Sequence, residues 1–222
     1  MDSPGAADRL ADNWLHAGRL LRSVTHDVNN HFGAILAYAE LIALAPGRMD
    51  DIATMAKDIT AAVRESTAQL SVAAALVSDD LVTVETIHLN ELLPRISRLF
   101  RFELDKGDAA IAFALPSEVC AFPGVRTRIV RALTHVIRHA ADTMGPEENA
   151  RRIRIRVTRS ATGFTIEIEG GSGSGELPVS LAEANEHVRY HRGEMAWVRQ
   201  GCIRIEIPQD TGVIKGGMGS SS

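Results

Sequence analysis

Two long stretches in the first third of the chain carry apolar residues at helical spacing. In the first, from about Asn13 to Ala45, these residues recur in alternating steps of three and four, which puts them on one stripe of a helix. Pro46-Gly47 is a stop signal, and a second helix is expected from Met49 to about Ser78. The two predicted stripes comprise Leu21, Val24, Val28, Phe32, Ile35, Ala39 and Ile42, then Ile52, Met55, Ile59, Val63, Leu70, Ala73 and Val77.

The short connection between the two helices predicts an antiparallel hairpin. Two helices with apolar faces this wide cannot bury them against each other alone. Two hairpins together would form a four-helix bundle, so the pattern predicts a homodimer.

After Asp79-Asp80 the pattern changes to short strands and helices. A short strand from Thr83 leads into a helix that closes at Lys106-Gly107-Asp108. Further elements are expected at Ala109–Leu115 (strand), Arg126–Met144 (helix), Ile153–Val157 and Phe164–Ile168 (hairpin), Val179–His191 (helix), and Glu194–Val198 and Cys202–Ile207 (hairpin). This succession predicts an α/β sandwich, in which helices cover one face of a mixed or antiparallel sheet.

The fold class is therefore α+β, with a helical hairpin at residues 13–80, a sandwich domain at 83–209 and a flexible Gly- and Ser-rich tail at 210–222. A chain of 222 residues with 45% hydrophobic and 23% charged residues can bury a proper core. A net charge of −4 without a basic block gives no reason to expect nucleic-acid binding.

Cysteine usage and hydropathy indicate the compartment. Cys120 and Cys202 lie far apart without metal-like spacing, which is typical of buried thiols in a reducing environment. No segment is long and apolar enough to span a bilayer, and residues 1–12 lack the apolar core of a signal peptide. We therefore expect a cytoplasmic protein without a membrane contact.

The candidate chemistry lies on the first helix. His26 is about 200° round the helix from Val24, so it leaves the apolar stripe and faces water. Asn30 shares its face and Asp27 flanks it. An exposed imidazole beside a carboxylate is usually an ordinary surface pair, but the helix phase and the asparagine four residues on favour a nucleophile. The candidate catalytic residues are His26, Asp27 and Asn30, whereas His31 is interpreted as structural.

The run His26-Asp27-Val28-Asn29-Asn30 resembles the H-box of bacterial sensor histidine kinases. The resemblance implies that His26 is phosphorylated, that Asp27 accepts a hydrogen bond from Nδ1–H so that Nε2 attacks phosphorus, and that Asn30 assists transfer or hydrolysis. The later elements are similar to the ATP-binding domain of that family, so the resemblance covers residues 15–209. Local agreement is found at Leu89–Leu93, Leu133–Met144 and His191-Arg192-Gly193.

Four parts of the nucleotide site depart from the family's pattern. His139 stands where the family has a magnesium-binding asparagine, and imidazole is a poor ligand for Mg²⁺. The adenine-binding Asp-x-Gly-x-Gly corresponds to Glu169–Gly175, where the acid is either Glu169 or absent. The second glycine box falls at residues 178–182, which contain no glycine, and the lid is nearly absent. Because transfer from ATP needs all these parts, the resemblance implies a degenerate domain that holds neither nucleotide cofactor nor metal.

The resemblance then implies a homodimeric phosphorelay histidine phosphotransferase of bacterial two-component signalling. It would pass phosphoryl groups between His26 and aspartates of response-regulator or hybrid-kinase receiver domains, with Mg²⁺ supplied by the receiver. The alternatives are a divergent ATP-dependent sensor kinase, with or without phosphatase activity, and a non-catalytic receiver-docking module.

Three other patterns have simpler explanations. Two histidine pairs have zinc-ligand spacing but no evident third ligand, namely His135/His139 and His187/His191. The run Gly170–Gly175 lacks the register of a dinucleotide loop. Alternate arginines in one strand are most simply its water-facing side, with a partner-binding basic patch as the alternative: Arg152, Arg154 and Arg156.

Overall fold

The computed structural model describes residues 6–44, 49–101, 104, 109–145 and 152–212. The chain forms two compact units, Met1–Val77 and Ser78–Ser222. The predicted connection at Pro46-Gly47, the predicted helix end at 106–108 and most of the predicted tail lie outside the described residues. The α+β class with a helical hairpin and an α/β sandwich is confirmed.

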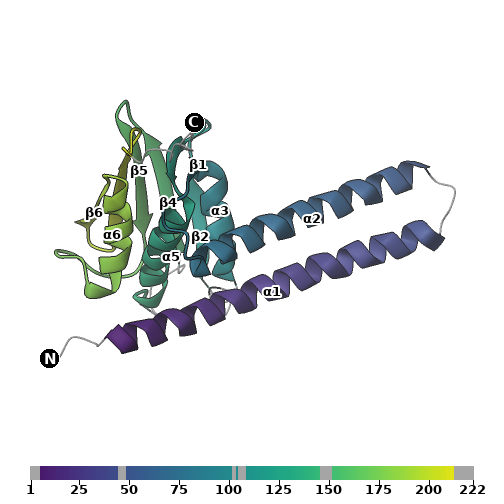
Figure 1. Cartoon of the computed structure of the whole chain (residues 1–222), viewed down its shortest axis with the longest axis horizontal. Helices are drawn as coiled ribbons and strands as arrows, with labels where there is room; N and C mark the ends of the chain where they lie inside the picture. Colours follow the sequence, from purple (N-terminus) through teal and green to yellow (C-terminus); the bar gives the residue numbers. More distant parts are fainter. Residues whose placement is uncertain (1–5, 45–48, 102–103, 105–108, 146–151, 213–222) are drawn as a thin grey trace, which may run out of the picture. The chain divides into compact units, whose positions relative to one another are not determined.

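The first unit is an antiparallel hairpin of α1 (Ala6–Leu44) and α2 (Met49–Val77), shown in Figure 1. The first helix begins seven residues before the predicted start, in an alanine-containing stretch that favours helix. Val24 and Val28 are buried, as predicted, but Phe32 is 55% exposed. Ala39 is exposed as well, so the predicted stripe is only partly buried within one hairpin. Large apolar side chains remain exposed at Phe32, Leu36, Leu41, Leu44, Val63, Leu70 and Val77.

The second unit has a five-stranded mixed sheet in the order β2-β4-β5-β7-β6, in which only β2 and β4 are parallel. A separate antiparallel pair joins β1 and β3. Helices α5 and α6 cover one face of the large sheet (Figure 1). The elements are β1 (Val84–His88), α3 (Leu89–Leu99), β2 (Ala110–Ala114), β3 (Ala121–Val125), α5 (Arg126–Asp142), β4 (Arg152–Arg159), β5 (Gly163–Glu169), the 3₁₀ helix η1 (Val179–Leu181), α6 (Ala182–Tyr190), β6 (Glu194–Arg199) and β7 (Cys202–Pro208).

The core lies between the sheet and the helices. Alternation along β4 buries Ile153, Ile155 and Val157, while the arginines between them are exposed, as predicted. The buried side of α5 is mostly apolar and includes Ile129 and Leu133, with Thr127 and Thr134 as its buried polar members. A single buried face on each element therefore defines the sandwich.

One strand was not predicted. β3 contains Pro123 and Gly124, which weaken any strand signal in the sequence. Its strand character comes from pairing with β1, in which Ile87 is paired with Phe122. Both of those side chains are buried, so long-range packing selects this strand.

Candidate functional site

His26 lies on the exposed surface of α1. Its side chain is 66% exposed, as the helix phase predicted, whereas that of Asp27 is only 15% exposed. Asn30, one turn further on, is exposed. The rigid backbone of α1 therefore presents the imidazole to solvent and keeps the carboxylate partly sheltered beside it.

Two side chains converge on one nitrogen of the His26 ring. Asp27 Oδ1 lies 3.3 Å from Nδ1, and Asn30 Nδ2 lies 3.3 Å from the same atom. Both distances are long for hydrogen bonds. None of the described side chains is bonded to Nε2, so this second nitrogen faces outward without a partner.

The tautomer of His26 decides whether Nε2 is a nucleophile. The Asp27 carboxylate can only accept a hydrogen bond, so it favours the tautomer with hydrogen on Nδ1. The Asn30 N–H can only donate, so it would favour a lone pair on Nδ1 instead. The amide of Asn30 satisfies an Nδ1–H donor once it is rotated to present its oxygen. In that arrangement Nε2 carries the lone pair, and both neighbours stabilise the ring in the orientation needed for attack.

Two other polar residues near His26 in the sequence, Asn29 and His31, do not belong to the site. Asn29 is exposed, consistent with its interpretation as helix surface. His31 lies on the other side of α1, with Nδ1 2.9 Å from the Ser66 hydroxyl of α2. His31 therefore links the two helices and takes no part in the surface site.

His139, the residue predicted to stand where the family has its magnesium-binding asparagine, is partly buried and packs against an aromatic side chain. The ring of His139 on α5 lies 5.8 Å from the indole of Trp197 on β6, edge to face. Burial lowers the pKa of His139, with a smaller opposing effect from Asp142. His139 Nε2 and Trp197 Nε1 are both buried without a hydrogen-bond partner.

The glycine run after β5 packs against the same indole. A Cβ atom on Gly173 would lie 2.5 Å from Trp197 Cζ2, so only glycine permits this contact at its φ of +137°. Gly173 O accepts from Gly201 N at 2.8 Å, and Ser172 N donates to Thr143 Oγ1 at 3.2 Å. The backbone N–H of Ser172, which a bound ligand could otherwise use, is thus already hydrogen-bonded within the protein. No sequence signal singled out Trp197, which joins the loop to α5 only in the folded chain.

The structure resolves the position of Glu169. It points to the exposed face of the sheet, where its carboxylate lies 2.9 Å from Arg199 and 3.8 Å from Arg154. Side chains alternate along β5, so Gly170 follows buried Ile168 on the inner side. The inner position next to α5 therefore carries no acidic side chain.

The histidine pairs do not form metal-ligand pairs. Val125 N donates to His191 Nε2 at 3.0 Å, and His191 Nδ1 donates to His187 O at 2.9 Å, so both ring nitrogens are used. His135 and His187 instead flank Glu183, at 3.6 and 3.5 Å. Within the described residues, no group of three or more His, Cys, Asp or Glu residues is arranged to hold a metal ion.

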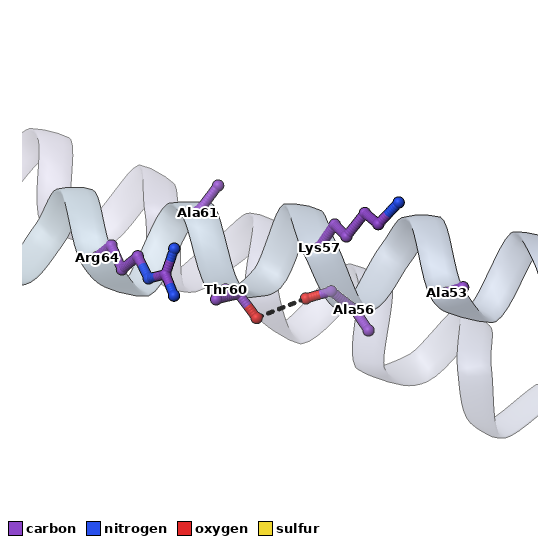
Figure 2. Close-up of a pocket in the computed structure, with 6 residues that line it drawn as sticks. All are labelled: Ala53, Ala56, Lys57, Thr60, Ala61 and Arg64. Atoms are coloured by element: carbon purple, nitrogen blue, oxygen red, sulfur yellow. Dashed lines mark hydrogen bonds between the residues drawn. The ribbon is translucent and has the colours of Figure 1, made fainter.

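A shallow groove runs along α2, and Figure 2 shows the residues that line it. Because His31 meets Ser66, residues 53–64 of the antiparallel α2 lie beyond His31, toward the closed end of the hairpin. The groove is lined by Ala53, Ala56, Lys57, Thr60, Ala61 and Arg64. Its lining residues all belong to α2, so it is a shallow depression on the surface of that helix.

Comparison with known proteins assigns the fold. No protein-family model and no curated protein matches the chain. Among solved structures, the catalytic domain of histidine kinase ThkA matches at 18% identity with a TM-score of 0.51, covering 60% of this chain and all of that chain (100%). The α/β unit has the fold of a histidine-kinase catalytic domain. Acinetobacter baumannii histidine kinase AdeS matches at 14% identity over 86% of this chain and 97% of its own, with a TM-score of 0.49.

At 18% identity this likeness assigns the fold of the α/β unit alone, so any chemistry has to be argued from the residues present. The α/β unit is built like the ATP-binding domain of a histidine kinase, and the helical hairpin precedes it, as predicted. In the described part of the chain, no helix has both the length and the hydropathy to cross a membrane.

Proposed function

We propose that this protein is a phosphorelay histidine phosphotransferase, with His26 as the phosphoryl carrier between receiver-domain aspartates of two-component signalling. The observation that carries this proposal is the geometry of the ring. Both neighbouring polar groups engage Nδ1 and leave the exposed Nε2 open to an incoming phosphoryl group. A histidine-kinase fold supports the same chemistry.

Transfer proceeds by in-line displacement on phosphorus. Nε2 of neutral His26 attacks the aspartyl phosphate of the receiver, the P–N bond forms as the P–O bond breaks, and the bonding pair leaves with the aspartate carboxylate. The ring keeps hydrogen on Nδ1 and becomes a phosphoimidazolium, whose charge Asp27 offsets at 3.3 Å. Asn30 supports the ring orientation through its contact with Nδ1, the receiver supplies Mg²⁺, and the reverse step returns the phosphoryl group to an aspartate.

Several contacts support a phosphoryl source other than ATP. The indole of Trp197 lies against both His139 and Gly173, the two positions that the family resemblance places at the nucleotide. Glu169 is held in ion pairs on the opposite face of the sheet. These contacts support our proposal that the positions expected to grip adenine and magnesium no longer do so.

Exposed apolar positions on the hairpin support a homodimer. Phe32 and Leu36 on α1 are exposed one turn apart, and Val63, Leu70 and Val77 repeat every seven residues on α2. The α2 groove includes the small side chains of Ala53, Ala56 and Ala61, which would permit close approach of another helix. Packing these faces against a second hairpin would bury them in a four-helix bundle.

Phosphotransfer from a panel of ³²P-labelled receivers to the purified chain tests the proposal. We expect a base-stable, acid-labile label on the wild-type chain, none on His26→Gln, and unchanged labelling of Asn29→Ala, the matched exposed control. With γ-labelled ATP and Mg²⁺ we expect no label. Labelling of His26→Gln by a receiver would refute the carrier assignment.

The two alternatives give different results in the same assay. Labelling of His26 from ATP would identify a divergent sensor kinase. Receiver binding in pull-down without any label on the chain would identify a docking module.

A further inference from the structure

Two rows of charged side chains cross the exposed face of the large sheet. One row contains Arg156, Glu167 and Arg204, the other contains Arg154, Glu169 and Arg199, and both end beside an uncharged edge strand. Glu167 on β5 pairs tightly with Arg204 at 2.8 Å, and Glu169 with Arg199 at 2.9 Å. The β4 arginines approach these same carboxylates only loosely. Arg156 lies 3.7 Å from Glu167, and Arg154 lies 3.8 Å from Glu169.

In each row a glutamate lies between two arginines. The β4 arginine is the less neutralised of the two, because the glutamate is closer to its other partner. The arginines are 58% and 64% exposed at Arg156 and Arg154. Glu206 approaches Arg204 at 3.8 Å, on the far side of the row from β4. Arg152 continues the β4 series and has no ion pair with any described residue.

The strand next to β4 is β2, with the sequence Ala-Ile-Ala-Phe-Ala, at the edge of the sheet. Its outward residues Ala110, Ala112 and Ala114 are in register with the three arginines. Small side chains there leave a hollow of about 170 Å³, whose charged lining residues are Arg154 and Arg156 together with their partners Glu169 and Glu167. Among the described strands, β2 pairs only with β4, so its other edge has unpaired backbone groups, without the charge or proline that commonly protect an edge.

We propose that β2 is a docking edge for an extended acidic peptide segment of a partner protein, which adds to the sheet as a sixth strand. Such a strand would lie about 10 Å from β4, at two strand spacings of about 4.8 Å. Across the alanines, Glu or Asp at every second position would reach Arg152, Arg154 and Arg156. Each row would then gain an acidic residue beyond its β4 arginine, so that positive and negative side chains alternate along the whole row.

The charges select this occupant over two others. A second copy pairing through β2 would bring two arginine rows toward each other, which opposes self-association. A nucleic acid could meet the arginines with its phosphates, but it has no peptide backbone to continue the ladder of β2 and would leave that edge unpaired. An acidic peptide satisfies both the backbone edge and the arginines.

Fluorescence anisotropy with the full chain tests the proposal. The probe is a labelled Thr-Glu-Val-Glu-Val-Glu-Thr peptide, and its counterpart has lysine at the three glutamates. We expect binding of the acidic peptide alone, weakened by added salt and by about tenfold in Arg154→Ala/Arg156→Ala. The matched control, Arg95→Ala/Arg189→Ala, removes the same charge from helices and should leave affinity unchanged.

Hydrogen exchange identifies the bound edge. The acidic peptide should slow exchange of β2 amides, a change that charge attraction without strand pairing would not produce. Equal binding of the lysine peptide, unchanged affinity in the arginine double variant, or no protection of β2 would overturn the proposal. So would tighter binding of an oligothymidylate at these arginines, or concentration-dependent protection of β2 in the chain alone.

Discussion

The His31 ring on α1 lies with Nδ1 2.9 Å from the Ser66 hydroxyl on α2. The Ser66 proton is already used, because Oγ donates to Ala62 O at 2.9 Å in its own helix. His31 must therefore donate from Nδ1, which fixes its tautomer and the pairing of the two helices five residues after His26.

Removing that acceptor should destabilise the hairpin. Ser66→Ala would leave the His31 N–H unpaired in a half-buried position, at a cost of about 1–2 kcal/mol in unfolding free energy. Urea denaturation measures the change. Thr67→Ala is the control, because exposed Thr67 makes the same kind of bond to Val63 O and should change stability by less than about 0.5 kcal/mol. Equal effects of the two variants would contradict the role of His31 as a link.

Asp27 should affect the rate of transfer more than it affects folding. Asp27→Asn removes the negative charge that favours Nδ1–H and offsets the phosphoimidazolium. We expect labelling of His26 to slow by about tenfold to hundredfold, with unchanged circular dichroism. Rapid-quench phosphotransfer gives the rate. A rate equal to wild type would show that Asp27 has no part in the chemistry.

The glycine loop gives a matched pair of substitutions. Gly171 has φ +73° and a Cβ there would meet Ala140 O at 2.6 Å, whereas Gly175 has φ +81° and open space around it. Gly175→Ala should cost about 1 kcal/mol for the strained backbone, and Gly171→Ala at least about 1 kcal/mol more for the clash. Thermal unfolding compares them, and equal losses would argue against tight packing of the loop on α5.

Acid should weaken the second unit. Burial lowers the pKa of His191 below its ordinary 6.5, and burial does the same for His135 and His139. The folded protein holds these rings in the neutral form, so their contribution to the free energy of unfolding is complete above pH 6.5. Below pH 6.5 the same rings take up protons in the unfolded chain first, and this contribution is lost. The slope should reach about 1.4 kcal/mol per pH unit for each histidine.

Denaturant titrations between pH 7.5 and 5 measure this dependence. His139→Gln should reduce the slope, whereas the control Thr86→Gln, at an exposed position without a titratable side chain, should not. A stability that is independent of pH over this range would contradict the prediction.

Charge on the exposed hairpin face should dissociate the dimer. Phe32→Asp would place a carboxylate in the expected bundle core, and we expect the dimer dissociation constant to rise by at least about hundredfold. Sedimentation velocity measures it. The control is Val179→Asp, since Val179 is 65% exposed but lies in the other unit. A monomeric wild type, or an unchanged dimer in Phe32→Asp, would count against the bundle.

The local pattern of residues was sufficient for much of this protein. Helical period alone placed His26 on the surface, away from Val24 and Val28, because side-chain direction on a helix depends only on sequence spacing. Alternation along β4 and β5 likewise gave the two faces of the sheet. The hairpin, the sandwich and the candidate site followed from these short-range rules.

Tertiary structure decided what depends on residues far apart in the chain. The contact of Trp197 with Gly173 and His139 joins a strand, a loop and a helix, and no local period encodes it. β3 exists through its pairing with β1, despite Pro123 and Gly124. The outward direction of Glu169 needed the register of β5, because a one-residue shift moves a side chain to the opposite face of a sheet.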